Sequence, residues 1–269
     1  MCETDGFMTG SRWLPAILST LLVAASVGSA QQESQAPAPA FESDQSAGRE
    51  ILDYSVEWRL VPAGTARFEW AATPHSAIAA SEAKLHLEST GLVSRLFRVN
   101  DDYSALLGQN LCAQSSFMAA REGNRNRETR VVFDERERKA KRVEKDLVKN
   151  TTAMDDVDIP PCVHDVMSGL MVLRELHLEP GKTAQIPISD GKKFALVKVE
   201  SERREEINTP LGMRKTIRYE VFLFDNIIYK RTGHLHVWLT DDNSQLPVQF
   251  QIRLQFAIGT ITLRLEKQS

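Results

Sequence analysis

The sequence is short of cysteine and of long apolar runs, and each shortage excludes a class of protein. Three cysteines among 269 residues are too few for the disulfide framework of a small secreted scaffold or for a cysteine-rich zinc module. A helix needs about 20 apolar residues to cross a bilayer, and no segment after residue 30 supplies such a run. The sequence therefore predicts neither a cysteine-stapled domain nor a membrane-spanning one.

Several binding and catalytic signatures are also missing. The sequence contains no G-x-S-x-G nucleophile elbow and no glycine-rich phosphate loop. Its formal net charge of -3 is opposite in sign to that of a general nucleic-acid binder. We therefore expect no nucleic acid, no cofactor and no metal among its partners.

Residues 1–30 are typical of a secretory signal peptide. The stretch "RWLPAILSTLLVAASVGSA" combines one basic residue with an apolar run of signal-peptide length, and it ends on a small-x-small sequence at Ala30. Acidic residues ahead of the run are unusual there, which leaves Met1 and Met8 as alternative starts. No cysteine stands at the predicted cleavage site, so we expect a soluble exported protein of the periplasm or cell envelope without a lipid anchor.

The rest of the chain changes composition near residue 48. Residues 31–48, rich in Pro, Ala, Ser and Gln, have little to bury and are predicted to form a flexible linker. Residues 49–269 have the length of a single β-rich domain. Within it, Cys112 and Cys162 could form a disulfide worth about 4 kcal/mol in the chain-entropy model, or they could remain two buried thiols. Sequence spacing does not decide between these alternatives.

Residues 49–269 are dominated by alternating apolar and polar residues, which is the period of a half-buried strand. In "ILDYSVEWRL" the apolar Leu52, Tyr54 and Val56 alternate with polar residues, and the alternation resumes after the "VPAG" turn, which predicts a hairpin over residues 51–71. The same pattern predicts strands in SEAKLHLEST, TRVVFD, RKAKRVEKD, KFALVKVESERREEI, RKTIRYEVFLF, HLHVWLT, PVQFQIRLQF and GTITLRLEK. We predict an all-β fold with a curved antiparallel sheet or a partly open barrel.

One segment, "DVMSGLMVLRELHL", has a helical period instead. Val166, Leu170 and Leu173 are spaced by three and four residues, which predicts an amphipathic helix. Prolines precede and follow the segment, as is common at helix ends. We expect this helix to cover an open face or mouth of the sheet.

Four stretches together carry a family resemblance. They are LDYSVEWRLVPAGTARFEW, the HDVMSGLMVLR helix ending in Arg174, NTPLGMRKTIRYEV, and VWLTDDNSQLPVQFQIRLQFAIGTITLRL. Over residues 50–269 the chain resembles a bacterial exported family known as domain of unknown function 3108. The resemblance implies an exported, mainly β domain, and it supplies no catalytic residue.

The pair Asp241 and Asp242 invites a catalytic or metal-binding interpretation. Adjacent residues on a strand point to opposite faces, so the two carboxylates cannot converge on one atom of a substrate. The surrounding "DDNSQLP" is rich in turn-forming residues and lacks the glycine and distal glutamate of a calcium loop. We predict a turn, with Pro247 at the start of the return strand.

Two patterns containing histidine are further candidates. His234 and His236 stand two apart on a predicted strand, so both imidazoles point to one face, but the neighbouring sequence offers no third ligand for zinc. His164, Asp165 and Ser168 could form a hydrolytic site, although no nucleophile elbow surrounds the serine. Asp165 also stands where a carboxylate favours the start of a helix.

Residues 121–149 carry more basic than acidic side chains. Alternation would place Lys139, Lys141 and Arg136 on one face of a β-ribbon, forming a cationic patch for anionic lipid headgroups, lipopolysaccharide or an acidic partner. The alternative is a solvated ribbon whose cross-strand ion pairs are each worth little.

Five aromatic residues, Trp58, Phe68, Trp70, Trp238 and Phe250, are expected on the concave face of the sheet. There they would either line a cavity for a lipid-like or glycan ligand or fill the core. We therefore expect a non-enzymatic binding or structural module of the bacterial cell envelope that contacts a lipid, a glycolipid or a cell-wall polymer. The alternatives are a hydrolase and a protein–protein scaffold, and a scaffold would show an exposed apolar patch or a long unpaired sheet edge.

Overall fold

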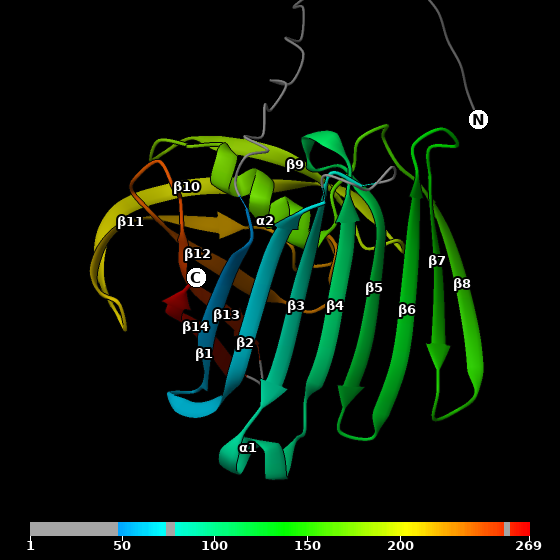
Figure 1. Cartoon of the computed structure of the whole chain (residues 1–269), viewed down its shortest axis with the longest axis horizontal. Helices are drawn as coiled ribbons and strands as arrows, with labels where there is room; N and C mark the ends of the chain where they lie inside the picture. Colours follow the sequence, from blue (N-terminus) through cyan, green and yellow to red (C-terminus); the bar gives the residue numbers. More distant parts are fainter. Residues whose placement is uncertain (1–47, 74–78, 256–258) are drawn as a thin grey trace, which may run out of the picture. The chain divides into compact units, whose positions relative to one another are not determined.

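The computed structural model describes residues 48–73, 79–255 and 259–269 (Figure 1), which lie in one of the two units into which the chain divides, Ala40–Ser269. The predictions for residues 1–47, and for Phe256 at the end of a predicted strand, lie outside these ranges. The strands are β1 (Glu50–Trp58), β2 (Val61–Ala72), β3 (Ser81–Ser89), β4 (Asn100–Leu107), β5 (Ala113–Glu122), β6 (Arg125–Asp134), β7 (Lys139–Asp146), β8 (Thr151–Asp158), β9 (Thr183–Ser189), β10 (Phe194–Thr209), β11 (Gly212–Val221), β12 (Gly233–Thr240), β13 (Pro247–Leu254) and β14 (Gly259–Gln268). The helical segments are α1 (Gly91–Leu96), the 3-10 helix η1 (Gln109–Leu111) and α2 (Val166–Glu175).

All of these strands belong to one antiparallel sheet. Their order across it is β8-β7-β6-β5-β4-β3-β2-β1-β14-β13-β12-β11-β10-β9. At its centre β1 pairs with β14, so that Leu52 lies opposite Gln268 and Trp58 lies opposite Ile261. In the part of the chain that the structure describes, β8 and β9 are the two edges and the sheet is not closed. The predicted fold class, a mainly β curved or partly open antiparallel sheet, is confirmed.

The strands predicted from alternation are present, and the sheet also contains β4, β5, β8 and β9, which the pattern does not predict. The edge strand β8 shows why, because exposed residues occur along it at both even and odd positions. A strand that buries neither face has no reason to alternate. The short helix α1 has no buried residue and was missed for the same reason.

Apolar side chains of the strands are buried in two clusters. The first includes Leu52 and Phe68 near the centre of the sheet, and the second includes Val199 and Tyr219 towards β9. Each fully buried side chain of this kind contributes about 1.5–3 kcal/mol to the hydrophobic driving force. Helix α2 packs against both clusters, because its Met167 belongs to the first and other residues of its apolar face belong to the second.

Helix α2 lies between the β2–β4 and β9–β12 parts of the sheet (Figure 1), and it contacts β4, η1 and β9. Its amphipathic period and its position agree with the prediction of a helix over an open part of the sheet. No helix among the described residues is long and apolar enough to cross a bilayer.

A short segment before the helix, residues 159–165, connects distant strands, and we call it the strap. The backbone N–H of Ala113, at the start of β5, donates to the carbonyl of Val163 at 2.8 Å. His164 forms a parallel bridge with Ile188 of β9, donating to Pro187 and accepting from Ser189, each at 2.9 Å. The strap therefore covers part of the free edge of β9 and fixes the start of α2.

The strap is also held covalently. Cys112 and Cys162 form a disulfide, with 5.1 Å between their Cα atoms. The bond joins the residue before β5 to the strap, and so it restrains the same connection as the hydrogen bond from Ala113.

Candidate functional site

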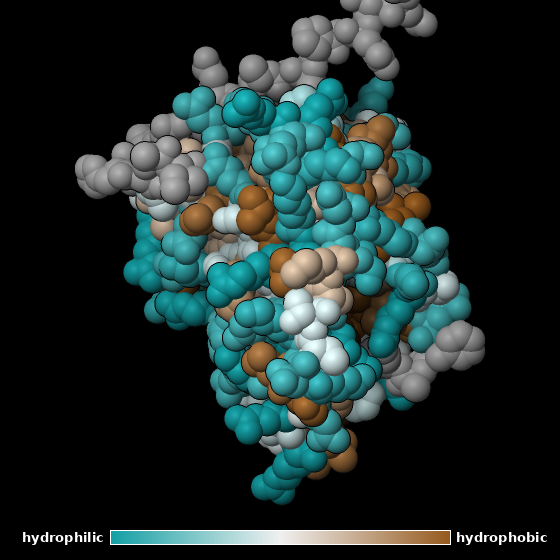
Figure 2. Space-filling model, turned by 90° about the vertical axis from the view of Figure 1, so that its right-hand side faces the viewer, coloured by the Kyte–Doolittle hydropathy of each residue, from teal (hydrophilic) through white to brown (hydrophobic). Residues whose placement is uncertain are grey.

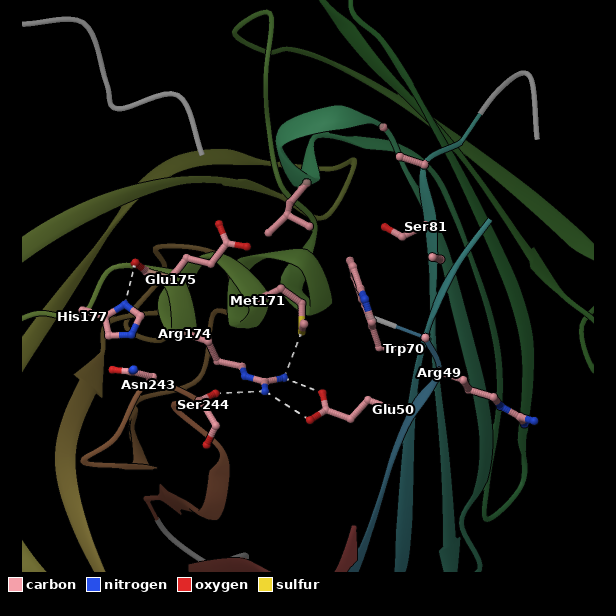
Figure 3. A pocket seen from close by; sticks show the side chains of 15 residues that line it. Arg49, Glu50, Trp70, Ser81, Met171, Arg174, Glu175, His177, Asn243 and Ser244 are labelled. Atoms are coloured by element: carbon pink, nitrogen blue, oxygen red, sulfur yellow. Dashed lines mark hydrogen bonds and ion pairs between the residues drawn. The ribbon is translucent and has the colours of Figure 1, made fainter. Parts of the chain in front are cut away.

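A pocket of about 340 Å³ opens beside helix α2 (Figure 3). Its walls come from the chain leading into β1, from β2 and β3, from the connection between β4 and β5, from α2 and from the β12–β13 turn. Pockets that hold small molecules measure about 300–1,000 Å³. This one has room for a small ligand or for one end of a longer molecule.

Two apolar side chains face the pocket from different elements. Figure 3 shows Trp70 of β2 and Met171 of α2 approaching it from two sides. Both side chains are only partly buried and pack against the two apolar clusters. An indole ring and a flexible thioether together form a surface that adapts to apolar ligands of different shapes.

A charged pair forms another part of the wall. Arg174 donates to both carboxylate oxygens of Glu50, at 2.7 and 3.2 Å, and to the carbonyls of Ser244 and Gln245, each at 3.2 Å. Bidentate pairs of this kind are strong and geometrically specific. Arg174 thus ties α2 to β1 and to the β12–β13 turn, and its donors are used within the protein.

The next residue on α2, Glu175, has a different environment. Its Oε2 atom is buried and has no hydrogen-bond partner in the part of the chain described. Burial raises the pKa of Glu175, against the opposing influence of Arg174 and His177. An unsatisfied buried acceptor costs about 1–3 kcal/mol, so a ligand that offers an O–H or N–H group would gain from a bond here.

Asp165 and Ser168 cap the start of helix α2. Asp165 Oδ1 accepts from the backbone N–H of Ser168 at 2.9 Å and from its hydroxyl at 2.5 Å, while Asp165 N–H donates to the Ser168 hydroxyl at 3.0 Å. This reciprocal arrangement is a capping box. The Tyr103 hydroxyl, from β4, donates to the other carboxylate oxygen of Asp165. Both cap residues are buried, and Ser168 is 0% exposed.

His164 makes a separate contact. Its Nδ1–H donates to the carbonyl of Leu111 at 2.9 Å, and burial lowers the pKa of its imidazole. The serine is thus bonded to the aspartate and the histidine to a backbone carbonyl, so the three side chains do not form a nucleophile–base arrangement. The geometry does not support a hydrolase built on His164, Asp165 and Ser168.

The predicted aromatic face is mostly core. Phe68 is 3% exposed in the first apolar cluster, and the ring of Phe250 packs edge-on against Tyr54 at 5.6 Å. Trp58, at the end of β1, lies under the guanidinium of Arg59 at 5.4 Å. Of the five predicted residues, Trp70 is the one that lines the pocket beside α2.

Trp238 is 6% exposed and belongs to the first apolar cluster, but its side chain does not leave the strand on the same side as Phe250. Val237 pairs with Phe250 across β12 and β13, so its neighbour Trp238 points to the opposite face. There its indole N–H donates to Glu205 at 2.7 Å, and its ring lies 6.1 Å from that of His236.

The two lysines of the predicted cationic patch form ion pairs with acidic side chains. Lys139 lies 2.9 Å from Asp158 of the edge strand, and Lys141 pairs with Glu137. Arg136 is in the exposed turn before β7. Figure 2 views the molecule from the side on which β8 lies in Figure 1, and this surface is mostly hydrophilic. The contacts favour the solvated ribbon over a patch of unmatched charge.

The turn predicted at Asp241 and Asp242 is confirmed. Asp242 Oδ1 accepts from the Thr240 hydroxyl and from the backbone and hydroxyl of Ser244, at 2.6–2.9 Å. Burial opposes ionisation of Asp242, but these hydrogen bonds outweigh it and lower its pKa. Asp241 instead accepts from Arg204 at 2.9 Å.

A sign expected of a scaffold is also present. The β1–β2 turn and the neighbouring α1 expose several large apolar side chains, among them Leu60 (82% exposed) and Leu96 (70%). Their exposure was not predicted from the sequence, and their apolar neighbours Val61 and Phe97 are exposed as well.

Sequence reasoning missed most of the pocket. Glu50 and Arg174 are separated by 124 positions, and no local pattern connects them. The one available signal was the Arg174–Glu175 pair at the end of an otherwise apolar helix face. Met171 lies on the predicted apolar face, but the helical period does not distinguish a core residue from one that lines a pocket.

Comparisons with known proteins support the fold. A beta-barrel-like protein with domain of unknown function DUF1849 from Brucella abortus is 9% identical, with a TM-score of 0.51 over 82% of this chain and 97% of that one. A candidate lipoprotein from Parabacteroides distasonis is 13% identical, with a TM-score of 0.36 over 83% and 96%. A candidate exported protein with a YmcC-like fold from Bacteroides fragilis is 10% identical, with a TM-score of 0.33 over 83% and 96%. Only the first of these is similar enough to bear on the fold.

No curated protein matches the chain. The model of the family described as "Protein of unknown function (DUF3108)" matches residues 53–266, which is most of the chain and includes nearly all of the four stretches that carry the resemblance. The chain therefore belongs to the DUF3108 family.

Proposed function

We propose that this protein is an exported, non-enzymatic binding module of the bacterial cell envelope, and that it holds a small lipid-like amphiphile in the pocket beside α2. The observation that carries the proposal is the division of the pocket wall. Trp70 and Met171 offer apolar surface, whereas Glu175 offers a buried carboxylate oxygen without a partner among the described residues. A ligand with an apolar part and a hydroxyl or ammonium group matches both.

The size of the pocket limits the ligand. A volume of about 340 Å³ is near the lower end of small-molecule sites. The pocket therefore takes the part of an amphiphile next to its polar group, and the remainder of a longer chain extends through the opening. Phe68 and its neighbours are buried in the first apolar cluster, so the proposal places no part of the ligand deeper in the sheet.

The proposed compartment rests on three observations. Residues 1–30 have the pattern of a signal peptide, the chain forms a disulfide, and the family is exported according to the resemblance above. Disulfides persist mainly in oxidising compartments such as the periplasm. The non-enzymatic assignment rests on the engagement of Ser168 in the helix cap and of His164 with Leu111.

Native mass spectrometry of protein purified from its own envelope, combined with lipid extraction, tests for a resident ligand. We expect a bound amphiphile that is released by organic solvent. Isothermal titration calorimetry then tests the pocket with lysophosphatidylethanolamine as the amphiphile and maltose as a glycan. The lipid should bind and the sugar should not. Binding of maltose alone would contradict the lipid-like assignment.

A pair of matched substitutions places the ligand. Met171→Trp fills the pocket and should weaken lysophosphatidylethanolamine binding at least tenfold. Met154→Trp makes the same change on β8, where the side chain is 77% exposed, and should leave binding unchanged. Equal binding by both variants would refute the pocket. Protein that carries no lipid and binds neither probe would instead favour the scaffold, with its exposed apolar surface around Leu60.

A further inference from the structure

Three side chains with metal-binding atoms meet on the face of the sheet opposite Val237. His236 of β12 lies directly across from Glu220 of β11, and Glu202 comes from the next strand, β10. One ligand atom from each of the three lies within 4.8 Å of the other two. All three side chains are partly buried, with 13–22% of each exposed. The cluster shares no residue with the pocket beside α2.

The spacing of these atoms suits one small cation. His236 Nε2 is 3.8 Å from Glu202 Oε2. Two ligands bound to zinc at about 2.0–2.1 Å each lie at most about 4 Å apart. Ligands of tetrahedral zinc lie about 3.3–3.4 Å apart, so the nitrogen and the oxygen must approach each other slightly to share an ion. The ligand atom of Glu220 lies within 4.8 Å of both and must approach as well.

Neighbouring donors hold both carboxylates in place. His234 Nδ1 lies 2.7 Å from Glu220 Oε1, and Arg218 donates to both oxygens of Glu202, one of them at 2.9 Å. The imidazoles of His234 and His236 stack with their centroids 6.3 Å apart. Groups that orient metal ligands through hydrogen bonds are a regular part of metal sites.

A backbone irregularity brings Glu202 into the cluster. The pairing of β10 with β11 shifts between Ser201 and Arg203, so Glu202 is the extra residue of a β-bulge. Bulges often re-aim a side chain at a functional site. Two carboxylates and one arginine leave the cluster with a net negative charge, which favours a divalent cation.

We propose that Glu202, Glu220 and His236 bind one divalent transition-metal ion of the zinc type, with a remaining coordination position open to solvent. One imidazole and two carboxylates are donors that zinc accepts, and three protein ligands with an open position are a common zinc arrangement. The sequence shows only the H-x-H pattern, because the two glutamates stand 16 and 34 positions earlier in the chain.

Competition for Zn²⁺ between the metal-free protein and a chromophoric chelator tests the site. We expect one equivalent of Zn²⁺ to bind to the wild type, and His236→Gln and Glu220→Gln each to weaken binding at least tenfold. His86→Gln is the matched control. His86 also lies between two carboxylates, 2.8 Å from Asp102 and 3.9 Å from Glu88, and its loss should not change the affinity. A wild type that binds no Zn²⁺, or variants that all bind alike, would overturn the proposal.

A second readout locates the metal and does not depend on how well a ligand variant folds. Cu²⁺ quenches nearby indoles, and the ring of Trp238 lies 6.1 Å from that of His236. One equivalent of Cu²⁺ should quench part of the wild-type fluorescence, and Trp238→Phe should remove the quenched part while Zn²⁺ still binds. Unchanged quenching in Trp238→Phe would place the metal elsewhere and refute the site.

Discussion

Replacing Cys112 and Cys162 with serine should destabilise the domain by about 4 kcal/mol in the chain-entropy model. The bond closes a loop between residues 50 positions apart, so its loss frees a large part of the unfolded chain. The native contacts of the strap, from Ala113 to Val163 and from His164 to β9, do not depend on the sulfur atoms. We therefore expect a cost through the unfolded state and little change in the folded structure.

Urea denaturation measures this cost. The double variant should unfold at a lower urea concentration, and its m-value should rise because a chain without the cross-link exposes more surface on unfolding. A domain of this size loses about 2–4 °C of Tm per kcal/mol, so the midpoint of thermal unfolding should fall by about 8–16 °C. Reducing the wild type should reproduce both changes, and reductant should not affect the variant.

The outcome that would refute the reasoning is a loss below about 1 kcal/mol with an unchanged m-value. It would mean that the strap already restrains the unfolded chain, or that the bond strains the native state enough to cancel its entropic gain. Wild-type protein that responds to reductant as weakly as the variant would refute it equally.

Three further predictions concern helix α2 and the strap. Burial lowers the pKa of His164 from its usual 6.5. The unfolded chain therefore binds more protons than the folded one as the pH drops through 6.5, and the free energy of unfolding falls. In urea denaturation His164→Gln should flatten this pH dependence between pH 7.5 and 5, and an unchanged slope would contradict the prediction. Asp165→Ala removes a helix cap worth about 0.5–2 kcal/mol and leaves the Tyr103 hydroxyl without its acceptor. We expect the free energy of unfolding in urea to fall by about 2–4 kcal/mol, and by less for Asp165→Asn. Equal losses for the two variants would count against a contribution from the Tyr103 hydrogen bond. Arg174→Met deprives Glu50 of its partner and should lower the free energy of unfolding by about 2–3 kcal/mol. The same substitution should cost less in a protein that already carries Glu50→Gln. Purely additive losses in this double-mutant cycle would show that the pair is not coupled.

Local periodicity was enough to predict the hairpin of β1 and β2 and the hairpin of β12 and β13. The first turn was placed wrongly, because it lies at Arg59 and Leu60 and the predicted turn residues "VPAG" begin β2. In β1 and β2 the buried residues lie on one face, so the alternation of the sequence reports the packing directly. In β12 the four consecutive residues 237–240 are buried, so both faces are covered there. It was not enough for β8, which is mostly exposed, has no fully buried residue and pairs with β7. The order of the strands in the sheet also could not be predicted from alternation, because no local pattern indicates that β1 pairs with β14.

The candidate sites were less predictable than the fold. The pocket depends on Glu50 meeting Arg174, and the metal cluster depends on a bulge that re-aims Glu202. Both are tertiary effects without a local signature. The side of the sheet on which Trp238 lies was predictable from the sequence, because Trp238 alternates with Val237 along β12.

The pairing of β1 with β14 has a consequence for how the chain reaches its folded state. The central pair of the sheet joins Leu52 to Gln268, so the middle of the sheet is incomplete until the final strand has been synthesised. Contacts between segments so distant along the chain form slowly, because the intervening loop must be closed first. In a nascent chain that lacks residues 259–268, β1 still pairs with β2 and β13 with β12, but each of β1 and β13 has one unpaired edge. This delay keeps the polypeptide from completing its sheet early. For the export proposed above, an unfinished sheet would suit passage through a membrane in an unfolded state, and it would also expose the chain to aggregation if transport stalled.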